Sequence, residues 1–319
     1  MIINLQREAK PAWSEVPREL KHALERILGG TIADAAVAWG GYGPSATFIL
    51  RTSDERKFFC KGTHPGFTDL GKTAFLNELS YYSSIPELAE FGPAFRGVAQ
   101  HAEWHLLVLD YVERTIEVPP WTDETFRGAI KMLARFHSGM PASARRVLPI
   151  AEEQTDFMAL YKAEGGWKSI ASEDQRAEFL ALFNDNAAAA RSWVHHDVRS
   201  DNLLFREADQ PLLIDFPYLA YGPTLMDVAF FLPSVAGEGG ALPADGLRRY
   251  EQMSYFRFEA RDVAVTVATV AGFFAARAGQ RDLPDLPRLR WVQKLQLFPS
   301  LTWLSELLKI QPPPAPKPF

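Results

Sequence analysis

The sequence of 319 residues contains only one cysteine, Cys60, and no excess of basic residues. A single cysteine excludes an intrachain disulfide and a cysteine-rich zinc site, and it fits a reducing compartment. The 34 Lys and Arg residues against 39 Asp and Glu residues give a net charge of −5. Because nucleic-acid-binding proteins normally carry a basic stripe, we expect no nucleic acid partner.

Long hydrophobic runs are also missing. The most hydrophobic run, residues 263–276, is shorter than the roughly 20 residues that cross a bilayer, so we expect a buried helix there and no membrane partner. The first ten residues, MIINLQREAK, have no apolar core of signal-peptide length. With 47% hydrophobic and 23% charged residues, the composition is that of a globular protein with a full core, which we expect in the cytoplasm.

The first third of the chain has the pattern of a small antiparallel sheet with one internal helix. A preceding helix is predicted over about 14–28, with Ser14 as its N-cap and Gly29-Gly30 as its end. The internal helix is predicted over about 69–84. Strand-like segments lie at about 32–39, 47–52, 57–61, 94–100 and 104–112.

Helical periodicity dominates the rest of the chain, at about 122–139, 173–191, 225–232 and long stretches of 247–309. The exception is a predicted β-hairpin, in which two short apolar runs bracket a polar turn between residues 202 and 216. The ending QPPPAPKPF is too rich in proline to fold and is expected to be a tail. The pattern predicts an α+β two-lobe plan, with lobes over residues 1–111 and 112–310 and a tail over 311–319.

The stretch HHDVRSDNLLF, residues 195–205, leads into this hairpin. His195, Asp197 and Asn202 have the spacing H-x-D-x-x-x-x-N, and Asp215 follows in a D-F sequence at the end of the next strand. This order and spacing match the catalytic loop and the metal-binding aspartate of kinases. The alternative is a polar hairpin loop with an Asx-turn, which the first pattern alone would allow but which gives no reason for the second.

Phosphoryl transfer needs the residue types found at these positions. A carboxylate near the acceptor hydroxyl orients it and accepts its proton, and we assign this role to Asp197. Mg²⁺ prefers hard oxygen ligands, which Asn202 and Asp215 supply together with the phosphates of ATP. The hairpin would hold these two ligands close together.

Three weaker signals precede this motif in the order that a kinase requires. The glycine-rich turn at residues 40–45 offers backbone N–H groups to phosphates, Lys61 ends a strand, and Glu78 lies on the packed side of a helix. Each has an ordinary alternative: a plain turn, a lysine whose stem covers apolar surface, and a glutamate bonded elsewhere. Their shared order favours an ATP site that includes Gly40, Gly41, Gly43 and Ser45.

The chain resembles the aminoglycoside phosphotransferase and choline-kinase superfamily, the small-molecule branch of the protein-kinase-like fold. Besides the catalytic motif, the resemblance rests on Leu133-Ala-Arg-Phe-His137 and on Gly222-Pro-Thr-Leu-Met-Asp227-Val-Ala. It covers about residues 30–235. The resemblance implies a protein-kinase-like two-lobe fold, with a small sheet lobe and a larger helical lobe.

The resemblance also implies residue roles. Asp197 would be the catalytic base, Asn202 and Asp215 the Mg²⁺ ligands, and Lys61 the lysine that contacts phosphate. Glu78 would hold Lys61 in place.

Further roles follow for the junction of the lobes and the catalytic loop. The backbone of the linker from Asp110 to Val112 would contact adenine, and Asp227 would bond the catalytic loop. Three positions depart from the family pattern. His196 replaces a glycine, Pro217 replaces the glycine of D-F-G and the acidic residue frequent in this branch, and Ala46 stands where a third glycine would be.

The implied activity is ATP- and Mg²⁺-dependent phosphoryl transfer to a hydroxyl of a small molecule. A protein kinase is disfavoured because no activation segment ending in A-P-E follows Asp215. An aminoglycoside or other amino sugar, choline, a methylthio sugar, homoserine and other metabolites all stay open as acceptors. A nucleotide-binding pseudokinase scaffold is the alternative from another class, although a scaffold would be free to lose the catalytic set that this chain retains.

The charge of the segment over residues 151–190 bears on the acceptor. It contains eight Asp or Glu residues and three Lys or Arg residues. Two interpretations stay open, a solvated helix face and the acidic rim of a pocket for a cationic amine.

Overall fold

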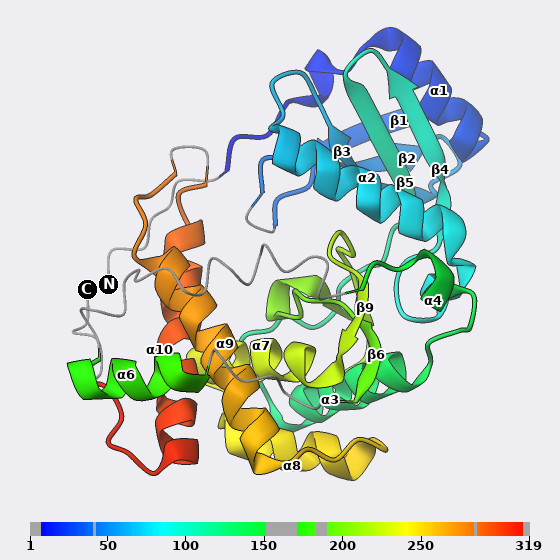
Figure 1. Ribbon diagram of the computed structural model, residues 1–319. Helices are drawn as coiled ribbons and strands as arrows, with labels where there is room; N and C mark the ends of the chain where they lie inside the picture. Colours follow the sequence, from blue (N-terminus) through cyan, green and yellow to red (C-terminus); the bar gives the residue numbers. More distant parts are fainter. Residues whose placement is uncertain (1–7, 41–42, 151–170, 183–189, 284–285, 315–319) are drawn as a thin grey trace.

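The computed structural model describes residues 8–40, 43–150, 171–182, 190–283 and 286–314, and it shows a sheet lobe above a larger helical lobe (Figure 1). The sheet has the strand order β1-β2-β3-β5-β4, and all neighbouring strands are antiparallel. The strands are β1 (Ile32–Val37), β2 (Ala46–Thr52), β3 (Lys57–Thr63), β4 (Phe95–His101) and β5 (Trp104–Asp110). The expected small antiparallel sheet is therefore confirmed.

The helix α2 (Asp69–Ser84) lies between β3 and β4, as the sequence predicted. Its N-cap is Thr68, whose side chain accepts a hydrogen bond from the backbone of Gly71. A short 3₁₀ segment, Pro86–Glu90, follows and leads to β4. The tyrosines near the end of α2 are buried in the large core that the sheet lobe shares with the helical lobe.

The first helix is shorter than expected. α1 spans Arg18–Leu28 and follows a separate 3₁₀ turn, Trp13–Glu15, so the prediction of Ser14 as N-cap is wrong. Pro17 occupies the N-cap position in an extended conformation and separates the two helical turns. The predicted end is confirmed, because Gly29 adopts the left-handed conformation with φ 64°.

Alternation along β3 places its side chains in two different cores. Phe58 and Cys60 are buried with the apolar face of α1, whereas Phe59 packs against the core that continues into the helical lobe. Lys61 therefore lies on the face opposite Cys60, toward the junction of the lobes. This alternation positions the lysine for the site described below.

The described part of the helical lobe contains two small antiparallel strand pairings and most of the large core. Its helices are α3 (Asp123–Ser138), α4 (Ala144–Val147), α6 (Glu173–Leu182), α7 (Thr224–Gly237), α8 (Pro243–Met253), α9 (Ala260–Ala278) and α10 (Leu289–Leu308). The strands β6 (Arg191–Val194) and β9 (Ala220–Pro223) pair, and β7 (Leu203–Phe205) pairs with β8 (Pro211–Leu213). The predicted helix over 173–191 is wrong at its end, because Arg191 begins a strand.

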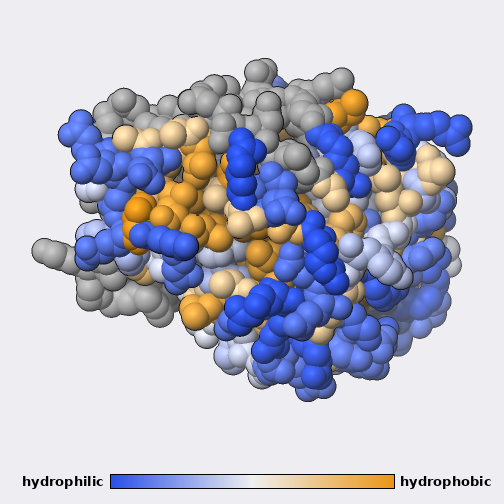
Figure 2. All heavy atoms as spheres, turned by 60° about the horizontal axis from the view of Figure 1, so that its bottom comes forward, coloured by the Kyte–Doolittle hydropathy of each residue, from blue (hydrophilic) through white to orange (hydrophobic). Residues whose placement is uncertain are grey.

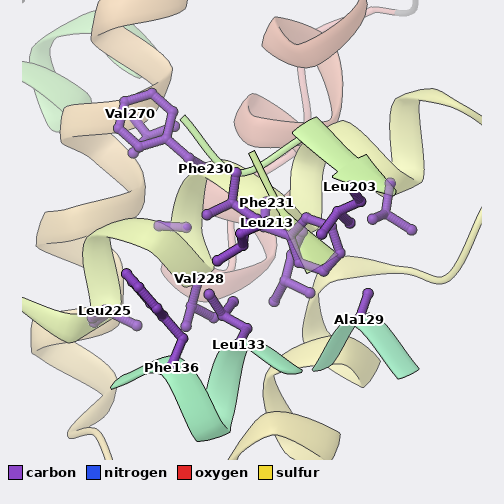
Figure 3. Close-up of a cluster of buried hydrophobic side chains, with 14 of the residues drawn as sticks. Ala129, Leu133, Phe136, Leu203, Leu213, Leu225, Val228, Phe230, Phe231 and Val270 are labelled. Carbon is purple, nitrogen blue, oxygen red and sulfur yellow. The ribbon is translucent and has the colours of Figure 1, made fainter. Parts of the chain in front are cut away.

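The β7–β8 hairpin is fixed by hydrophobic packing beneath it. Leu203 and Leu213, which face each other in the hairpin, are both buried, and Figure 3 shows them beside apolar side chains of α3 and α7. α7 contributes Phe231 and α3 contributes Leu133 to this cluster. Since burying each such side chain contributes about 1.5–3 kcal/mol, the hairpin has a rigid base for the loop that precedes it.

The hydrophobic run near residue 263 forms most of α9, which is buried along nearly its whole length. Within the described part of the chain, no helix combines the length and the hydrophobicity needed to span a membrane. The end of the helical lobe away from the sheet shows an apolar area bordered by hydrophilic side chains (Figure 2), as is common on folded proteins. The described start of the proline-rich tail has no helix or strand, and Gln175 of α6 donates a hydrogen bond to the carbonyl of Gln311.

Candidate active site

The backbone of the catalytic loop is held by Asp227, near the start of α7. Its carboxylate accepts hydrogen bonds from the backbone N–H of His195 at 2.6 Å and of His196 at 2.7 Å. The imidazole of His137, on α3, contacts the same carboxylate at 3.1 Å. Burial would raise the pKa of Asp227, but the hydrogen bond from His137 and the nearby histidines hold it below its usual value. The predicted role of Asp227 in bonding the loop is confirmed.

His196 explains why a glycine would suit this position. Its φ is 64°, in the left-handed region where residues other than glycine are uncommon. The backbone bond to Asp227 and a contact of 3.1 Å between Nδ1 of His196 and the carbonyl of Tyr218 hold it there. The chain therefore carries an imidazole directly before Asp197, where a glycine would have no side chain.

Asp197 lies in a partly buried position beside two groups of its own loop. The amide nitrogen of Asn202 donates to the Asp197 backbone carbonyl at 2.8 Å and to its carboxylate at 3.1 Å, and Arg199 lies 3.3 Å from the same carboxylate. Burial raises the pKa of Asp197 to about 7, although Arg199 opposes the shift. A carboxylate with a pKa near the working pH is suited to accept a proton from a hydroxyl.

Arg199 was not given a role by the sequence pattern. Its guanidinium binds the carboxylate of Asp201 through two hydrogen bonds, at 3.0 and 3.2 Å, while it also contacts Asp197. Asp201 thereby orients the arginine toward the carboxylate of Asp197. The arrangement adds a cation to the site where phosphate charge would be placed.

His195 joins the catalytic loop to the segment that carries Asp215. Its Nε2 donates to the carbonyl of Ile214 at 2.9 Å, and its Nδ1 accepts from the backbone N–H of Asp197 at 3.2 Å. Burial lowers the pKa of His195, which agrees with the neutral form that these two bonds require. The backbone N–H of Ile214 also donates to the carbonyl of Asn202 at 3.0 Å, so the two predicted metal ligands are held next to each other.

Lys61 contacts two carboxylates. Its ammonium lies 2.9 Å from Glu78 of α2 and is in direct contact with Asp215. Burial alone would lower the pKa of Lys61, but the carboxylates of Asp215 and Glu78 together raise it. Burial raises the pKa of Glu78, whose other oxygen accepts from the backbone N–H of Phe216 at 3.1 Å. The sheet lobe and the hairpin thus meet at these charges.

The glycine-rich turn connects β1 to β2 above these charges. Gly40 has a φ of 154°, and the space around Gly40 and Gly43 is open where a side chain would lie. Gly41 lies outside the described residues. Ser45 directly precedes β2. The described part of the turn therefore leaves open space beside the backbone at Gly40 and Gly43.

Asp110 and Val112 lie at the end of β5, where the chain leaves the sheet lobe. Arg96 binds the Asp110 carboxylate with two hydrogen bonds of 2.6 Å, and the backbone N–H of Asp110 donates to the carbonyl of Ala94 at 2.9 Å. These groups of Asp110 are engaged within the sheet lobe. The contact of the Asp110–Val112 backbone with adenine stays a prediction.

The scattered histidines do not form a metal site. Over the described ranges, no group of three or more His, Cys, Asp or Glu side chains could hold a metal ion. Asn202 and Asp215 are a different kind of pair, an amide and a carboxylate that lie just before β7 and just after β8. Such a pair is suited to a hard ion that takes its other ligands from phosphates.

Comparisons with known proteins agree with this geometry. A family model described as the APH phosphotransferase enzyme family matches residues 35–264. No curated protein matches the chain.

Three solved structures illustrate the similarity in fold. The choline kinase LicA from Streptococcus pneumoniae has a TM-score of 0.58 at 15% identity, covering 90% of this chain and 99% of its own. A spectinomycin phosphotransferase in complex with ADP and spectinomycin has a TM-score of 0.56 at 16% identity, covering 88% and 94%.

An aminoglycoside-3'-phosphotransferase of type VIII also has a TM-score of 0.56, at 18% identity, and covers 81% of this chain and 100% of its own. The protein-kinase-like two-lobe fold that the sequence implied is therefore confirmed. Because the family model spans most of the chain, including the catalytic loop and both predicted metal ligands, the chain belongs to the APH phosphotransferase enzyme family.

Proposed function

We propose that the protein transfers the γ-phosphoryl group of ATP to a hydroxyl of a small molecule in a Mg²⁺-dependent reaction. The observation that carries the proposal is the convergence of Asp197, Asn202, Asp215 and Lys61 from two lobes onto one site. Nucleotides in the solved relatives support the ATP part, since one holds ADP and another AMP-PNP with Ca²⁺. The family match supports phosphoryl transfer itself.

The residues present fit a Mg²⁺ ion. The Nδ2 amide of Asn202 is turned toward Asp197, which leaves its carbonyl oxygen for a cation, and Asp215 supplies a carboxylate with its side chain 34% exposed. When bound, the ion would neutralise charge on the phosphates. Lys61, which contacts Asp215 in the structure, would bind the same phosphates and be held by Glu78.

Asp197 would act on the acceptor. The acceptor oxygen forms a bond to the γ-phosphorus while the bond from that phosphorus to the bridging oxygen of ADP breaks, and the hydroxyl proton passes to Asp197. The raised pKa of Asp197 favours this proton transfer near neutral pH. Arg199, 3.3 Å from the carboxylate, would keep Asp197 ionised until the hydroxyl is in place.

One acceptor class to be tested is a cationic amine or amino sugar. The support is the acidic segment that precedes β6. Glu152 and Glu153 lie outside the described residues, whereas Glu173 and Asp174 are exposed at the start of α6. A negative potential beside the helical lobe would draw in cations, with a capture rate that falls as salt rises. We place the reaction in the cytoplasm, because the one cysteine is a buried free thiol.

The test is ADP release across a panel of hydroxylated amines, amino sugars, neutral sugars and amino acids, with the Asp197→Asn variant as the inactive control. Acceptor-dependent ADP release by the natural protein supports the proposal, and a preference for the amines supports the cationic acceptor. Binding of MgATP without ADP release for any acceptor would instead favour a pseudokinase scaffold. Release that is equal for Asp197→Asn would remove the assigned base.

A further inference from the structure

The described chain begins with a segment that touches both lobes. Glu8 is buried and forms two hydrogen bonds with the guanidinium of Arg288, at 2.9 and 2.5 Å, next to the start of α10. Two residues later, the ammonium of Lys10 donates to the hydroxyl of Thr47 at 2.7 Å and contacts the carbonyl of Gly40 at 3.4 Å. Figure 1 shows this segment passing beside the loop before α10 on its way to the sheet lobe.

Strand register places Lys10 on the phosphate side of the sheet. Thr47 of β2 pairs directly with Lys61 of β3. Directly paired residues on neighbouring strands point to the same face, with their Cβ atoms about 4.5–5.5 Å apart. The ammonium that binds the Thr47 hydroxyl therefore lies on the face that carries Lys61. Gly40, its other contact, belongs to the glycine-rich turn.

The ammonium of Lys10 has no carboxylate as a direct partner among the described residues. Its two contacts are neutral oxygens, and the Thr47 hydroxyl uses its own proton to bond the carbonyl of Ala38 at 2.7 Å. The charges that act on Lys10 from a distance include Glu8 and Asp215, which favour its protonation, and Lys61 and Arg288, which oppose it. A partly buried cation in this setting is stabilised by an added anion.

We propose that Lys10 is a second phosphate-binding lysine, which contacts the terminal phosphates of a nucleoside triphosphate from the side of the glycine-rich turn. The Glu8–Arg288 ion pair positions Lys10 by fixing the N-terminal segment to the helical lobe. The proposal rests on the proposed function in one respect, that the site around Lys61 and Asp215 binds ATP. It differs in assigning part of the phosphate contact to a residue that is not itself part of any kinase-like motif.

Isothermal calorimetry with Mg²⁺ and AMP-PNP, ADP or adenosine tests this role. Lys10→Met should weaken AMP-PNP binding roughly 10- to 100-fold, as expected for losing one charge-assisted hydrogen bond to phosphate. Adenosine binding should be unchanged, because adenosine has no phosphate. Lys10→Arg should restore most of the AMP-PNP affinity, and Lys131→Met, at an exposed lysine of α3, is the control with the same change of charge.

A purely structural role for Lys10 gives another pattern. If Lys10 only fixed the turn to Thr47, Lys10→Met would weaken adenosine and AMP-PNP equally, and this result would overturn the proposal, as would unchanged affinity for AMP-PNP. Glu8→Gln, which breaks the positioning ion pair but leaves the ammonium, should give a smaller loss confined to the phosphorylated ligands. Failure of the natural protein to bind any of the three ligands would overturn the proposed function. This result differs from those that overturn the role of Lys10 alone.

Discussion

The ammonium of Lys61 lies 2.9 Å from the carboxylate of Glu78, across the junction between β3 and α2. Glu78 is almost fully buried, with 1% of its side chain exposed, so its charge depends on the lysine. Glu78→Gln removes this charge but keeps an oxygen for the backbone N–H of Phe216. We expect about tenfold weaker MgATP binding in calorimetry, the effect of one misplaced charge-assisted hydrogen bond.

The exposed Glu90→Gln is the control for this first prediction, because it makes the same chemical change in the 3₁₀ segment after α2. A nucleotide-bound structure with the charged atoms of Lys61 and Glu78 well beyond about 4 Å apart would contradict the pairing.

Asp197→Asn should separate turnover from binding. The substitution removes the proton acceptor and keeps the size of the side chain, so turnover should fall roughly 10²- to 10⁴-fold. MgATP affinity should stay nearly unchanged, because the carboxylate is assigned to the acceptor. Steady-state kinetics and calorimetry measure the two effects, with Asp209→Asn in the exposed hairpin turn as control. A parallel loss of MgATP affinity would argue against the assignment.

Asp215→Ala, unlike Asp197→Asn, should lower the affinity for MgATP. The variant loses a metal-ligand oxygen and a carboxylate partner of Lys61, so it should bind ATP much less tightly than the natural protein when Mg²⁺ is present. The difference should shrink when the metal is removed by chelation. Normal MgATP binding by Asp215→Ala in calorimetry would contradict the assignment of Asp215 as a Mg²⁺ ligand.

Local features of this site were predictable from the sequence. The range of α2 and the alternation around Lys61 follow from apolar spacing, and the hairpin follows from two short apolar runs around a polar turn. These signals depend on residues a few positions apart, which the sequence shows directly. The error at Ser14 is of the same local kind: Pro17 interrupts the helix that apolar spacing alone would extend.

Contacts between distant segments were not predictable. Glu8 and Arg288 are 280 residues apart, and Lys10 and Gly40 are 30 apart. Nothing in the composition near Lys10 marks it, since its position is set by the ion pair to α10 and by the register of β2 with β3. The residues that bind the acceptor were not predictable either, because no sequence motif marks them.

The affinity for AMP-PNP should depend on pH through Lys10. Burial lowers the pKa of Lys10 to about 8 in the free protein, and a bound phosphate would raise it. The ammonium contribution is therefore present below pH 8 and weakens as the pH rises above 8, by at most about tenfold per pH unit. Calorimetry from pH 7 to 9.5 should show this decline in the natural protein. Lys10→Arg, which stays charged, should not show it, and an equal decline in Lys10→Met would assign it to another group.

The left-handed backbone of His196 allows a last prediction about stability. An L-residue in this conformation costs roughly 1–2 kcal/mol, which glycine does not incur. His196→Gly and His196→Ala both lose the contact between the imidazole and the carbonyl of Tyr218, so the difference between them isolates the backbone. Asp227, which accepts the N–H of residue 196, should hold the same conformation in both variants. We expect the free energy of unfolding to be about 1 kcal/mol higher for the glycine variant than for the alanine variant, measured by urea denaturation with equal m-values. Equal stabilities would mean that the loop relaxes to another conformation when the imidazole is absent.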